Sequence, residues 1–533
     1  MLDLAKAGAD AEFETEICVI GAGAAGISLT RKLLEAGHEV ALLESGGTDY
    51  EPDVAALNAG DNIGEDYYAL EDSRLRFFGG TTAIWGGRCA ELDPIDLEAR
   101  AYVPHSGWPI DWRELALYYE EARPLFGIPR RRAEPELFRR AGIALPPFDG
   151  DELRTPLWTF DRRFNRFTFA SCSDLREHPR CRIVTHATVT EIKAEPSGRG
   201  IGRVEARSLG GHRLNVAAKA FVLAAGGIEN PRLLLASRSI MPAGLGNAHD
   251  QVGRYFMEHP HARGGRIVDG AAWRLLKAFG RRHRIDGQDL AALITPGEAL
   301  QRREGILNTS LTITARQPHG RRQFFGMKAY TGLKHKMAPT KGGRALWMAT
   351  KKAAGWAQRH VDPARPWALH KLGSLEVALL VRAEQAPNPA SRVTLTGESD
   401  ATGVARAALD WRLSEIDVRS VAVLVDALGR ELKRLGLGRV EPAEWLQSGG
   451  SRWQTDPLIS SHPIGGYHHM GTTRMAASPR NGVTDGHGRV HGIGNLWVAG
   501  SSLFPTGSWA NPTLTIVALA LRTADRISAE LRR

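Results

Sequence analysis

Short, uniformly apolar runs that end in glycine turns are the most regular feature of this chain. Residues 17–20 form one such run and residues 40–43 the next, and a helical pattern that ends near Gly37 lies between them. Uniform apolar runs of this length are typical of strands buried on both faces of a parallel sheet. The pattern therefore predicts a strand, a glycine turn, a helix and a second strand near the N-terminus.

Further runs of the same kind lie far along the chain. Residues 184–192 and 221–225 have the pattern of strands, and residues 496–499 precede Gly500 and an apolar helix over residues 513–527. Strands of one sheet would thus come from the start, the middle and the end of the sequence. We therefore predict an α/β fold whose Rossmann-like nucleotide-binding sheet is assembled from discontinuous segments and interrupted by insertions.

The insertions predict a second domain, because they lack the alternation of strand and helix. Residues 391–395 and 407–411 alternate like strands, and residues 416–437 have helical spacing. We expect an α+β substrate-binding domain with an antiparallel sheet. The predicted division assigns residues 1–100, 181–264 and 456–533 to the nucleotide-binding domain and residues 101–180 and 265–455 to the substrate-binding domain.

The turn after the first predicted strand carries the fingerprint GxGxxG, formed by Gly21, Gly23 and Gly26. The first glycine allows a tight turn, the second lets the backbone approach a pyrophosphate, and the third lets helix and strand pack closely. Glu44 follows the second strand, where a carboxylate accepts from ribose hydroxyls and would repel the 2′-phosphate of NADP. The fingerprint does not separate NAD from FAD, and a glycine turn without a ligand is the plain alternative.

Composition narrows the class of protein. The chain has 533 residues, of which 43% are hydrophobic, and its four cysteines lie far apart with no CxxC pair. That spacing argues against a disulfide scaffold, a zinc site and an iron–sulfur cluster, and we expect no metal ion. No apolar run approaches the roughly 18 residues of a membrane-spanning helix. Five acids in residues 1–16 argue against a secretory signal, so we expect a cytoplasmic protein.

The net charge of +10 is unevenly distributed, since residues 305–361 contain eleven basic residues and no acid. Such a stretch can attract an anionic membrane surface, nucleic acid or an acidic partner. No nucleic-acid motif accompanies it, so we expect no nucleic-acid partner. A solvated basic face and a weak membrane or partner contact both remain open.

The residues best suited to chemistry lie near the C-terminus. Residues 465–475 contain His468 and His469, and residues 500–515 contain Asn511. Histidine can take a proton near neutral pH, and asparagine can donate to and accept from a substrate hydroxyl. A second glycine-rich loop over residues 76–87 predicts either an anion-binding nest or a surface loop.

Together these motifs resemble the glucose–methanol–choline (GMC) family of flavin oxidoreductases. The resemblance rests on the glycine fingerprint, the GGTTAIWGG loop, the HHMGTTRM run and the ANPTLTI ending, which lie in the family's order and bracket essentially the whole chain. The ANPTLTI ending is similar to the pyranose-oxidase, glycoside-oxidising branch, which works on sugars. Residues 265–455 carry no recognisable motif, and the choice of substrate would lie there.

The resemblance implies a role for individual positions. His468 would be the base that deprotonates the alcohol, and Asn511 would hydrogen-bond the alcohol oxygen. His469 is an alternative base or a substrate contact, and Trp509 would either form the floor of the sugar site or simply pack. The expected cofactor contacts are Gly21, Gly23, Ala24, Ala25, Gly26 and Glu44 on the adenosine-diphosphate part, Val189 at the adenine, Gly80, Thr81 and Thr82 on the flavin side, and Ala225, Gly500, Pro512 and Thr513. Pro512 would take the first helical position of the last helix.

The expected reaction is the FAD-dependent oxidation of a small-molecule alcohol, namely a secondary hydroxyl of a sugar or glycoside, with hydride transfer to flavin N5. Ile84 stands near the position where covalently flavinylated relatives carry a histidine, so we expect non-covalent FAD. Three alternatives remain: a dehydrogenase of an aromatic or alicyclic alcohol, a flavin subunit of a membrane-linked electron-transfer complex that docks through residues 305–361, and a plain NAD enzyme. The electron acceptor, whether oxygen, a quinone or a carrier, is left open.

Overall fold

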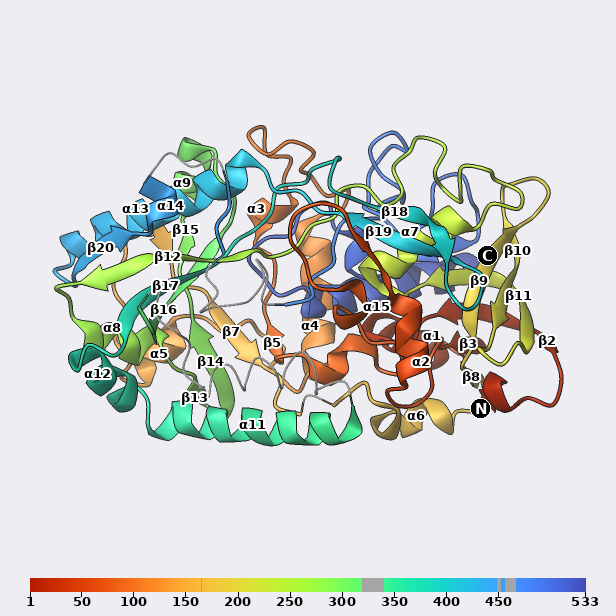
Figure 1. Cartoon of the computed structure of the whole chain (residues 1–533), viewed down its shortest axis with the longest axis horizontal. Coiled ribbons are helices and arrows are strands. Elements are labelled where there is room, and N and C mark those ends of the chain that lie inside the picture. Colours follow the sequence, from red (N-terminus) through yellow and green to blue (C-terminus); the bar gives the residue numbers. More distant parts are fainter. Residues whose placement is uncertain (164, 319–339, 448–451, 456–465) are drawn as a thin grey trace.

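The computed structural model describes residues 1–163, 165–318, 340–447, 452–455 and 466–533. A mostly parallel sheet occupies one end of the molecule, with both chain termini, and an antiparallel sheet occupies the other (Figure 1). Each end has its own buried apolar core. The predicted combination of a mixed α/β fold with antiparallel sheets is therefore confirmed.

The larger sheet has eight strands in the order β1-β8-β3-β2-β11-β10-β9, with β21 beside β11. Its strands are β1 (Leu2–Asp3), β2 (Ala11–Ile20), β3 (Val40–Leu43), β8 (Cys181–Thr185), β9 (Thr188–Ala194), β10 (Ile201–Arg207), β11 (Arg213–Leu223) and β21 (Leu496–Val498). Parallel pairing joins β1, β8, β3, β2, β11 and β21, whereas β9, β10 and β11 run antiparallel. The expected run 184–192 is broken at His186, whose φ of 53° turns the chain between β8 and β9.

Three helices pack side by side next to this sheet. Helix α1 (Ala24–Glu35) packs on α15 (Thr513–Leu531), which packs on α4 (Trp112–Leu125). Leu115 and Tyr119 of α4 are buried in the same core as the parallel sheet. Part of the segment 101–180, which the sequence assigned to the substrate-binding domain, thus packs with the nucleotide-binding core.

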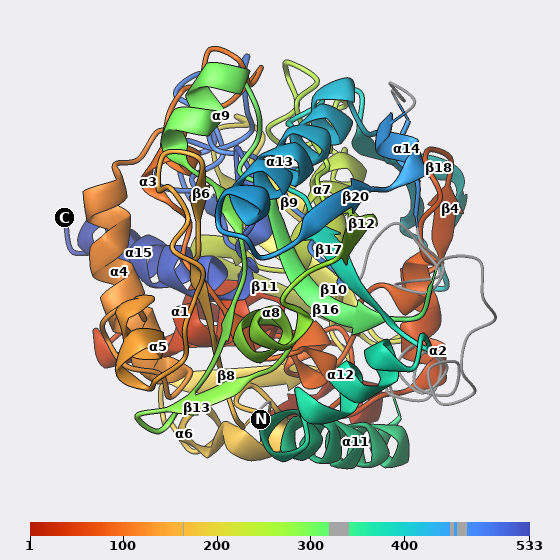
Figure 2. The same cartoon turned by 90° about the vertical axis from the view of Figure 1, so that its left-hand side faces the viewer.

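The antiparallel sheet at the other end has the order β16-β17-β12-β20. Its strands are β12 (His261–Val268), β16 (Ser310–Arg316), β17 (Glu376–Arg382) and β20 (Arg439–Pro442), and the helices around it are α8 (Ala272–Phe279), α9 (Glu298–Glu304), α12 (Ala364–Lys371), α13 (Glu415–Arg434) and α14 (Glu444–Gln447). A capping box between Ser414 and Asp417 starts α13, and Val421, Leu424 and Leu428 bury its apolar face. Figure 2 looks onto this end, where α13 crosses in front of the sheet.

Two predicted strands lie elsewhere than expected. Strands β18 (Arg392–Ser399) and β19 (Ala405–Asp410) form an antiparallel hairpin, and β19 also pairs in parallel with β4 (Gly60–Asn62). These three strands form a small sheet that is separate from the antiparallel sheet at the other end. The hairpin packs on α7 (Gly226–Ala236), where Val393 and Leu409 are buried with Ile228. An alternating pattern shows that one face is buried, but it does not say which partner buries it.

The remaining elements are small, apart from one long helix. They are β5 (Arg88–Cys89), β7 (Leu157–Phe160), β13 (His283–Ile285) and β14 (Gln288–Ala292) in one sheet, β6 (Leu153–Arg154) with β15 (Thr295–Pro296), and the helices α2 (Pro52–Ala55), α3 (Pro94–Leu97), α5 (Glu136–Arg140), α6 (Ser173–Arg176) and α11 (Lys341–His360). In the part of the chain that the structure describes, no helix is long and apolar enough to cross a bilayer.

Candidate active site

A cavity runs from the turn between β2 and α1 to the start of α15. It encloses about 1950 Å³ of space between atoms, part of which is open to solvent. Of the residues expected to contact cofactor or substrate, those that line it are Gly21, Gly23, Ala24, Ala25, Glu44, Gly80, Thr81, Thr82, Val189, Ala225, His468, His469, Gly500, Asn511, Pro512 and Thr513. Segments nearly 500 positions apart therefore converge on one space.

The β2–α1 turn fits a diphosphate. A Cβ on Gly26 would lie 2.0 Å from the carbonyl oxygen of Gly21, so this glycine brings helix and strand together without lining the cavity. Gly21 has a φ of +105°, which favours glycine. Above Gly23 there is open space within 4 Å, and no side chain caps α1 there. The first N–H groups of α1 are thus left for an anionic ligand.

Glu44 lines the cavity beside the β2–α1 turn, at the end where the adenosine part of the cofactor is expected (the adenosine end). Its carboxylate is buried and accepts from the backbone N–H groups of Ala22 at 3.0 Å and Gly46 at 2.9 Å. Burial raises the pKa of Glu44 against the effect of these hydrogen bonds. The side chain therefore fixes the turn and presents its remaining acceptor capacity to the cavity, as binding to ribose hydroxyls requires.

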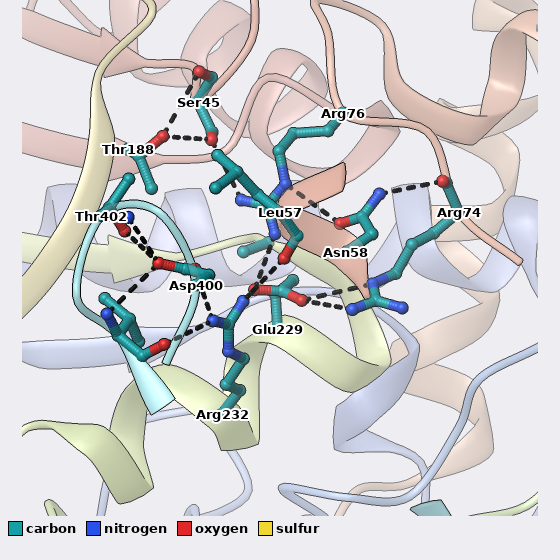
Figure 3. Close-up of polar contacts among 12 residues, drawn as sticks. Ser45, Leu57, Asn58, Arg74, Arg76, Thr188, Glu229, Arg232, Asp400 and Thr402 are labelled. Carbon is teal, nitrogen blue, oxygen red and sulfur yellow. Dashed lines mark hydrogen bonds and ion pairs between the residues drawn. The ribbon is translucent and has the colours of Figure 1, made fainter. Parts of the chain in front are cut away.

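A buried charge network forms the wall beside this end (Figure 3). Glu229 of α7 accepts from Arg74 at 2.6 Å and pairs with Arg76 at 2.9 Å and Arg232 at 3.1 Å, and Arg232 donates to Asp400 at 2.6 Å. The three guanidinium groups hold the pKa of Glu229 well below its usual value although burial opposes them. The network holds three cations and two carboxylates, and Glu44 at the same end supplies a third carboxylate, so the charges there are balanced and the diphosphate is expected at the N–H groups of the β2–α1 turn.

The reactive end of the cavity is formed by His468 and Asn511. Their side chains meet with Asn511 Nδ2 3.3 Å from His468 Nε2. The other ring nitrogen of His468, Nδ1, lies 2.7 Å from Nδ1 of His259. His259 Nε2 in turn lies 2.7 Å from the carbonyl oxygen of Ser508 and 3.3 Å from that of Gly507.

These contacts define the tautomers of both neutral rings. Carbonyl oxygens only accept, so His259 Nε2 carries the hydrogen and its Nδ1 accepts. His468 Nδ1 must then be the donor, which leaves the lone pair of His468 on Nε2, facing Asn511. The basic nitrogen of His468 thus lies at the cavity wall, where its lone pair accepts from the amide of Asn511.

Burial keeps these rings neutral. It lowers the pKa of His259 to about 4, and it holds the pKa of His468 well below its usual value with help from His259 and Arg382. Glu258, the residue before His259, accepts from the hydroxyl of Tyr67 at 2.5 Å and from the backbone N–H of His468 at 3.0 Å. Burial raises the pKa of Glu258 to about 8. His468 is therefore fixed through both its backbone and its ring.

Two further predicted residues have clear positions. His469 lines the cavity, and its Nε2 is buried without a hydrogen-bond partner and 3.9 Å from Glu258. Trp509 is 1% exposed and donates from its indole to Asp93 at 2.9 Å, away from the cavity wall. Trp509 thus anchors the loop that carries Ser508 instead of forming the floor of the sugar site. Pro512 is the N-cap of α15, one position before the first helical position that was predicted for it.

Sequence reasoning missed several residues at the reactive end. Glu258 and His259 lie in the run Met257–His261, which carries no motif that singles them out. The cavity is also lined by Arg88 and Arg382. His259 could have been sought because a histidine base needs a partner on its second ring nitrogen. The sequence does not say which distant histidine supplies that partner.

The basic stretch 305–361 lies beside the same cavity in its described part. Arg344 of α11 pairs with Asp49, Lys351 donates to the carbonyl oxygen of Trp85, and Trp347 packs on Ile84. Several of its charges thus serve the fold, whereas Lys341 and Lys352 are exposed. Five basic residues of the stretch, Arg321, Arg322, Lys328, Lys334 and Lys336, lie outside the described residues, as does His462.

Two family models match the segments that form this site. Residues 16–244 match the family model of FAD dependent oxidoreductases, and residues 387–520 match that of GMC oxidoreductases. Together the two models cover the turn, the network and both catalytic candidates. The chain belongs to the GMC oxidoreductase family.

Relatives of this GMC oxidoreductase act on alcohols and glycosides. It is 26% identical to the 2-methyl-1,2-propanediol dehydrogenase of Mycolicibacterium austroafricanum, over 97% of this chain and 95% of that protein. It is 27% identical to the C-glycoside 3-oxidase of Microbacterium trichothecenolyticum, over 85% and 75% of the two chains. A fungal aryl-alcohol oxidase has the same fold, with a TM-score of 0.58 at 15% identity over 97% and 99%. The cofactor of the family is FAD, so the NAD alternative is set aside.

Proposed function

We propose that this GMC oxidoreductase oxidises a secondary hydroxyl of a sugar or glycoside, with His468 as the general base. The observation that carries the proposal is the unprotonated Nε2 of His468, which accepts from Asn511 Nδ2 at 3.3 Å and is directed by His259 on the opposite nitrogen. Bound FAD supplies the hydride acceptor. Non-covalent binding is part of the proposal, because Ile84 stands where a linking histidine would be needed.

The chain's own residues would act as follows. Asn511 donates its amide N–H to the substrate oxygen once the alcohol enters, and His468 Nε2 takes the hydroxyl proton. The resulting imidazolium keeps its Nδ1–H on His259, so the proton is held without a change in geometry. Positioned base catalysis of this kind contributes about 10²–10⁴ in rate.

A sugar or glycoside is favoured over other alcohols by two observations. The ANPTLTI ending is similar to the pyranose-oxidase branch, and a C-glycoside 3-oxidase is among the relatives. A non-sugar alcohol is the second candidate, because a 2-methyl-1,2-propanediol dehydrogenase matches nearly the whole chain at similar identity.

Anaerobic reduction of the bound flavin tests both candidates. The holoenzyme is mixed with sugars, glycosides, diols and aromatic alcohols, and bleaching of the flavin is followed. Sugars or glycosides should reduce it fastest, and His468→Ala should retain FAD while slowing reduction by about 10²-fold or more. His249→Ala, at an exposed position, is the matched control. Reduction of the His468→Ala flavin at the wild-type rate would remove His468 as the base.

A further inference from the structure

Two arginines lie at the reactive end of the cavity. Arg88 is on β5 and Arg382 ends β17, so they come from two different sheets. Both guanidinium groups lie over the ring of Trp158, with Cζ 5.2 Å and 5.1 Å from its centroid. Both lower the pKa of His468, which places them within electrostatic reach of the base.

Arg382 has no anionic partner among the residues that the structure describes. Within the described part of the chain, its guanidinium makes no hydrogen bond and no ion pair. It makes one cation–π contact there, with the ring of Trp158. The acids that line the cavity are Glu44, Glu229 and Asp400. All three are engaged at the adenosine end, by backbone N–H groups or by the network of Figure 3.

The surroundings of Arg382 make this arrangement costly without a ligand. Burial and the nearby charges of Arg88 and Arg316 hold the pKa of Arg382 well below its usual value. An arginine normally remains charged, so the like charges repel one another in a poorly solvated place. An anion bound between the guanidinium groups and the base would relieve this repulsion.

The diphosphate of the cofactor does not account for these charges. The β2–α1 turn already suits it at the other end of the cavity, where Arg74, Arg76 and Arg232 are paired with Glu229 and Asp400. Arg88 and Arg382 instead share their space with His468, where the substrate must enter for its hydroxyl to reach Nε2.

Resting on the proposed function, we infer that the alcohol oxidised here carries a carboxylate, which Arg382 binds with Arg88 beside it. A planar guanidinium can donate two parallel N–H groups to a carboxylate, which fixes both its position and its orientation. The substrate class is therefore a sugar acid or a uronic acid glycoside, held by its charged end while His468 and Asn511 act on a hydroxyl.

Matched substrate pairs test the inference in the holoenzyme. Anaerobic flavin reduction is compared for glucose and glucuronate, galactose and galacturonate, and a neutral glucoside and the glucuronide of the same aglycone. In at least one pair the acid should show a second-order reduction rate at least about tenfold higher, through tighter binding. Arg382→Gln should abolish this preference, so that the ratio of the acid rate to the neutral rate falls to about one, and Arg382→Lys should retain part of the preference. Arg439→Gln, an exposed arginine of β20, controls for the loss of one charge.

The outcomes separate the inference from the proposed function. Equal rates for acid and neutral partners overturn the carboxylate site and leave alcohol oxidation standing. A preference for glucose 6-phosphate over glucuronate overturns the carboxylate in favour of a phosphate. If no alcohol reduces the flavin, the proposed function fails, and the site is tested by titrating non-reacting propionate against the flavin spectrum. A saturable change that is about tenfold weaker in Arg382→Gln supports the site, and no saturable change overturns it.

Discussion

At the scale of single residues, the proposed base His468 depends on a chain of hydrogen bonds that links Ser508, His259 and Asn511. The carbonyl oxygen of Ser508 fixes the hydrogen of His259, which fixes that of His468, which leaves Nε2 open toward Asn511. Ser508 is itself held by its hydroxyl on Asp96 at 2.6 Å, and Trp509 by its indole on Asp93. The loop that precedes Asn511 thus positions both partners of the proposed base.

Replacing His259 tests this chain of hydrogen bonds. His259→Leu leaves the Nδ1–H of His468 buried without an acceptor, which costs about 1–3 kcal/mol and should slow flavin reduction by about tenfold to a hundredfold. His259→Gln offers an amide oxygen in its place and should retain more of the rate, whereas FAD binding should be unchanged in both. Stopped-flow reduction measures the difference, and equal rates in the two variants would reduce His259 to a packing role.

The pH dependence of reduction follows from the neutral state of His468. The active form is the unprotonated ring, and burial with the positive charge of Arg382 lowers its pKa. As pH falls, activity should therefore persist through 6.5, the ordinary value for histidine, and decline only in more acidic buffer. Arg382→Gln removes one of these causes and should move the decline to higher pH with a neutral substrate. An acid limb at or above pH 6.5 in the wild type would contradict the arrangement.

How much of the site could be predicted from sequence depends on where each residue's partner lies. Asn511 and His468 belong to motifs, and the cavity brings them together as expected, although their roles remain proposals. Glu258, His259 and Arg382 contact residues more than a hundred positions away, namely Tyr67, His468 and Trp158, and carry no local pattern. For Trp509 the sequence left open whether it forms the floor of the sugar site or packs, and its buried indole donates to Asp93, away from the cavity wall.

At the scale of elements, the buried strands were predictable and their partners were not. The apolar runs 17–20, 40–43 and 496–499 are strands β2, β3 and β21, because strands covered on both faces are apolar throughout. The hairpin β18–β19 has one buried face, and that face meets α7 instead of the antiparallel sheet. Alternation fixes which side chains point inward, whereas pairing is decided by long-range packing.

The glycines of the β2–α1 turn allow fold and cofactor binding to be separated. Gly26→Ala forces a Cβ to within 2.0 Å of the Gly21 carbonyl oxygen, so it should destabilise the apoprotein itself. Gly23→Ala meets nothing within 4 Å in the protein and should leave apoprotein stability unchanged, but its methyl group occupies the space that suits the diphosphate. Thermal unfolding of the apoproteins and fluorescence titration with FAD measure the two effects, and normal FAD affinity in Gly23→Ala would contradict the assigned place of the diphosphate.

At the scale of the whole molecule, the cavity wall is built from both apolar cores. The wall draws on the β2–α1 turn, the loop of residues 79–88, α7, the end of β17 and the start of α15, and so on both apolar cores. A ligand that fills this space contacts all of them at once. Cofactor binding should therefore stabilise the molecule as a unit and not only the parallel sheet.

Removal of FAD tests this linkage together with the proposed non-covalent binding. Denaturation in acid should release all of the flavin into the supernatant, because no histidine stands at the position of Ile84. The refolded apoprotein should unfold at lower temperature, and FAD at a thousand times its Kd should restore about 4 kcal/mol of unfolding free energy. Hydrogen exchange should show the gain on α7 and β17 as well as on α1, since each contributes to the cavity wall. Flavin that stays attached to the denatured chain would contradict the first expectation, and protection confined to α1 would show that the two ends of the molecule respond independently.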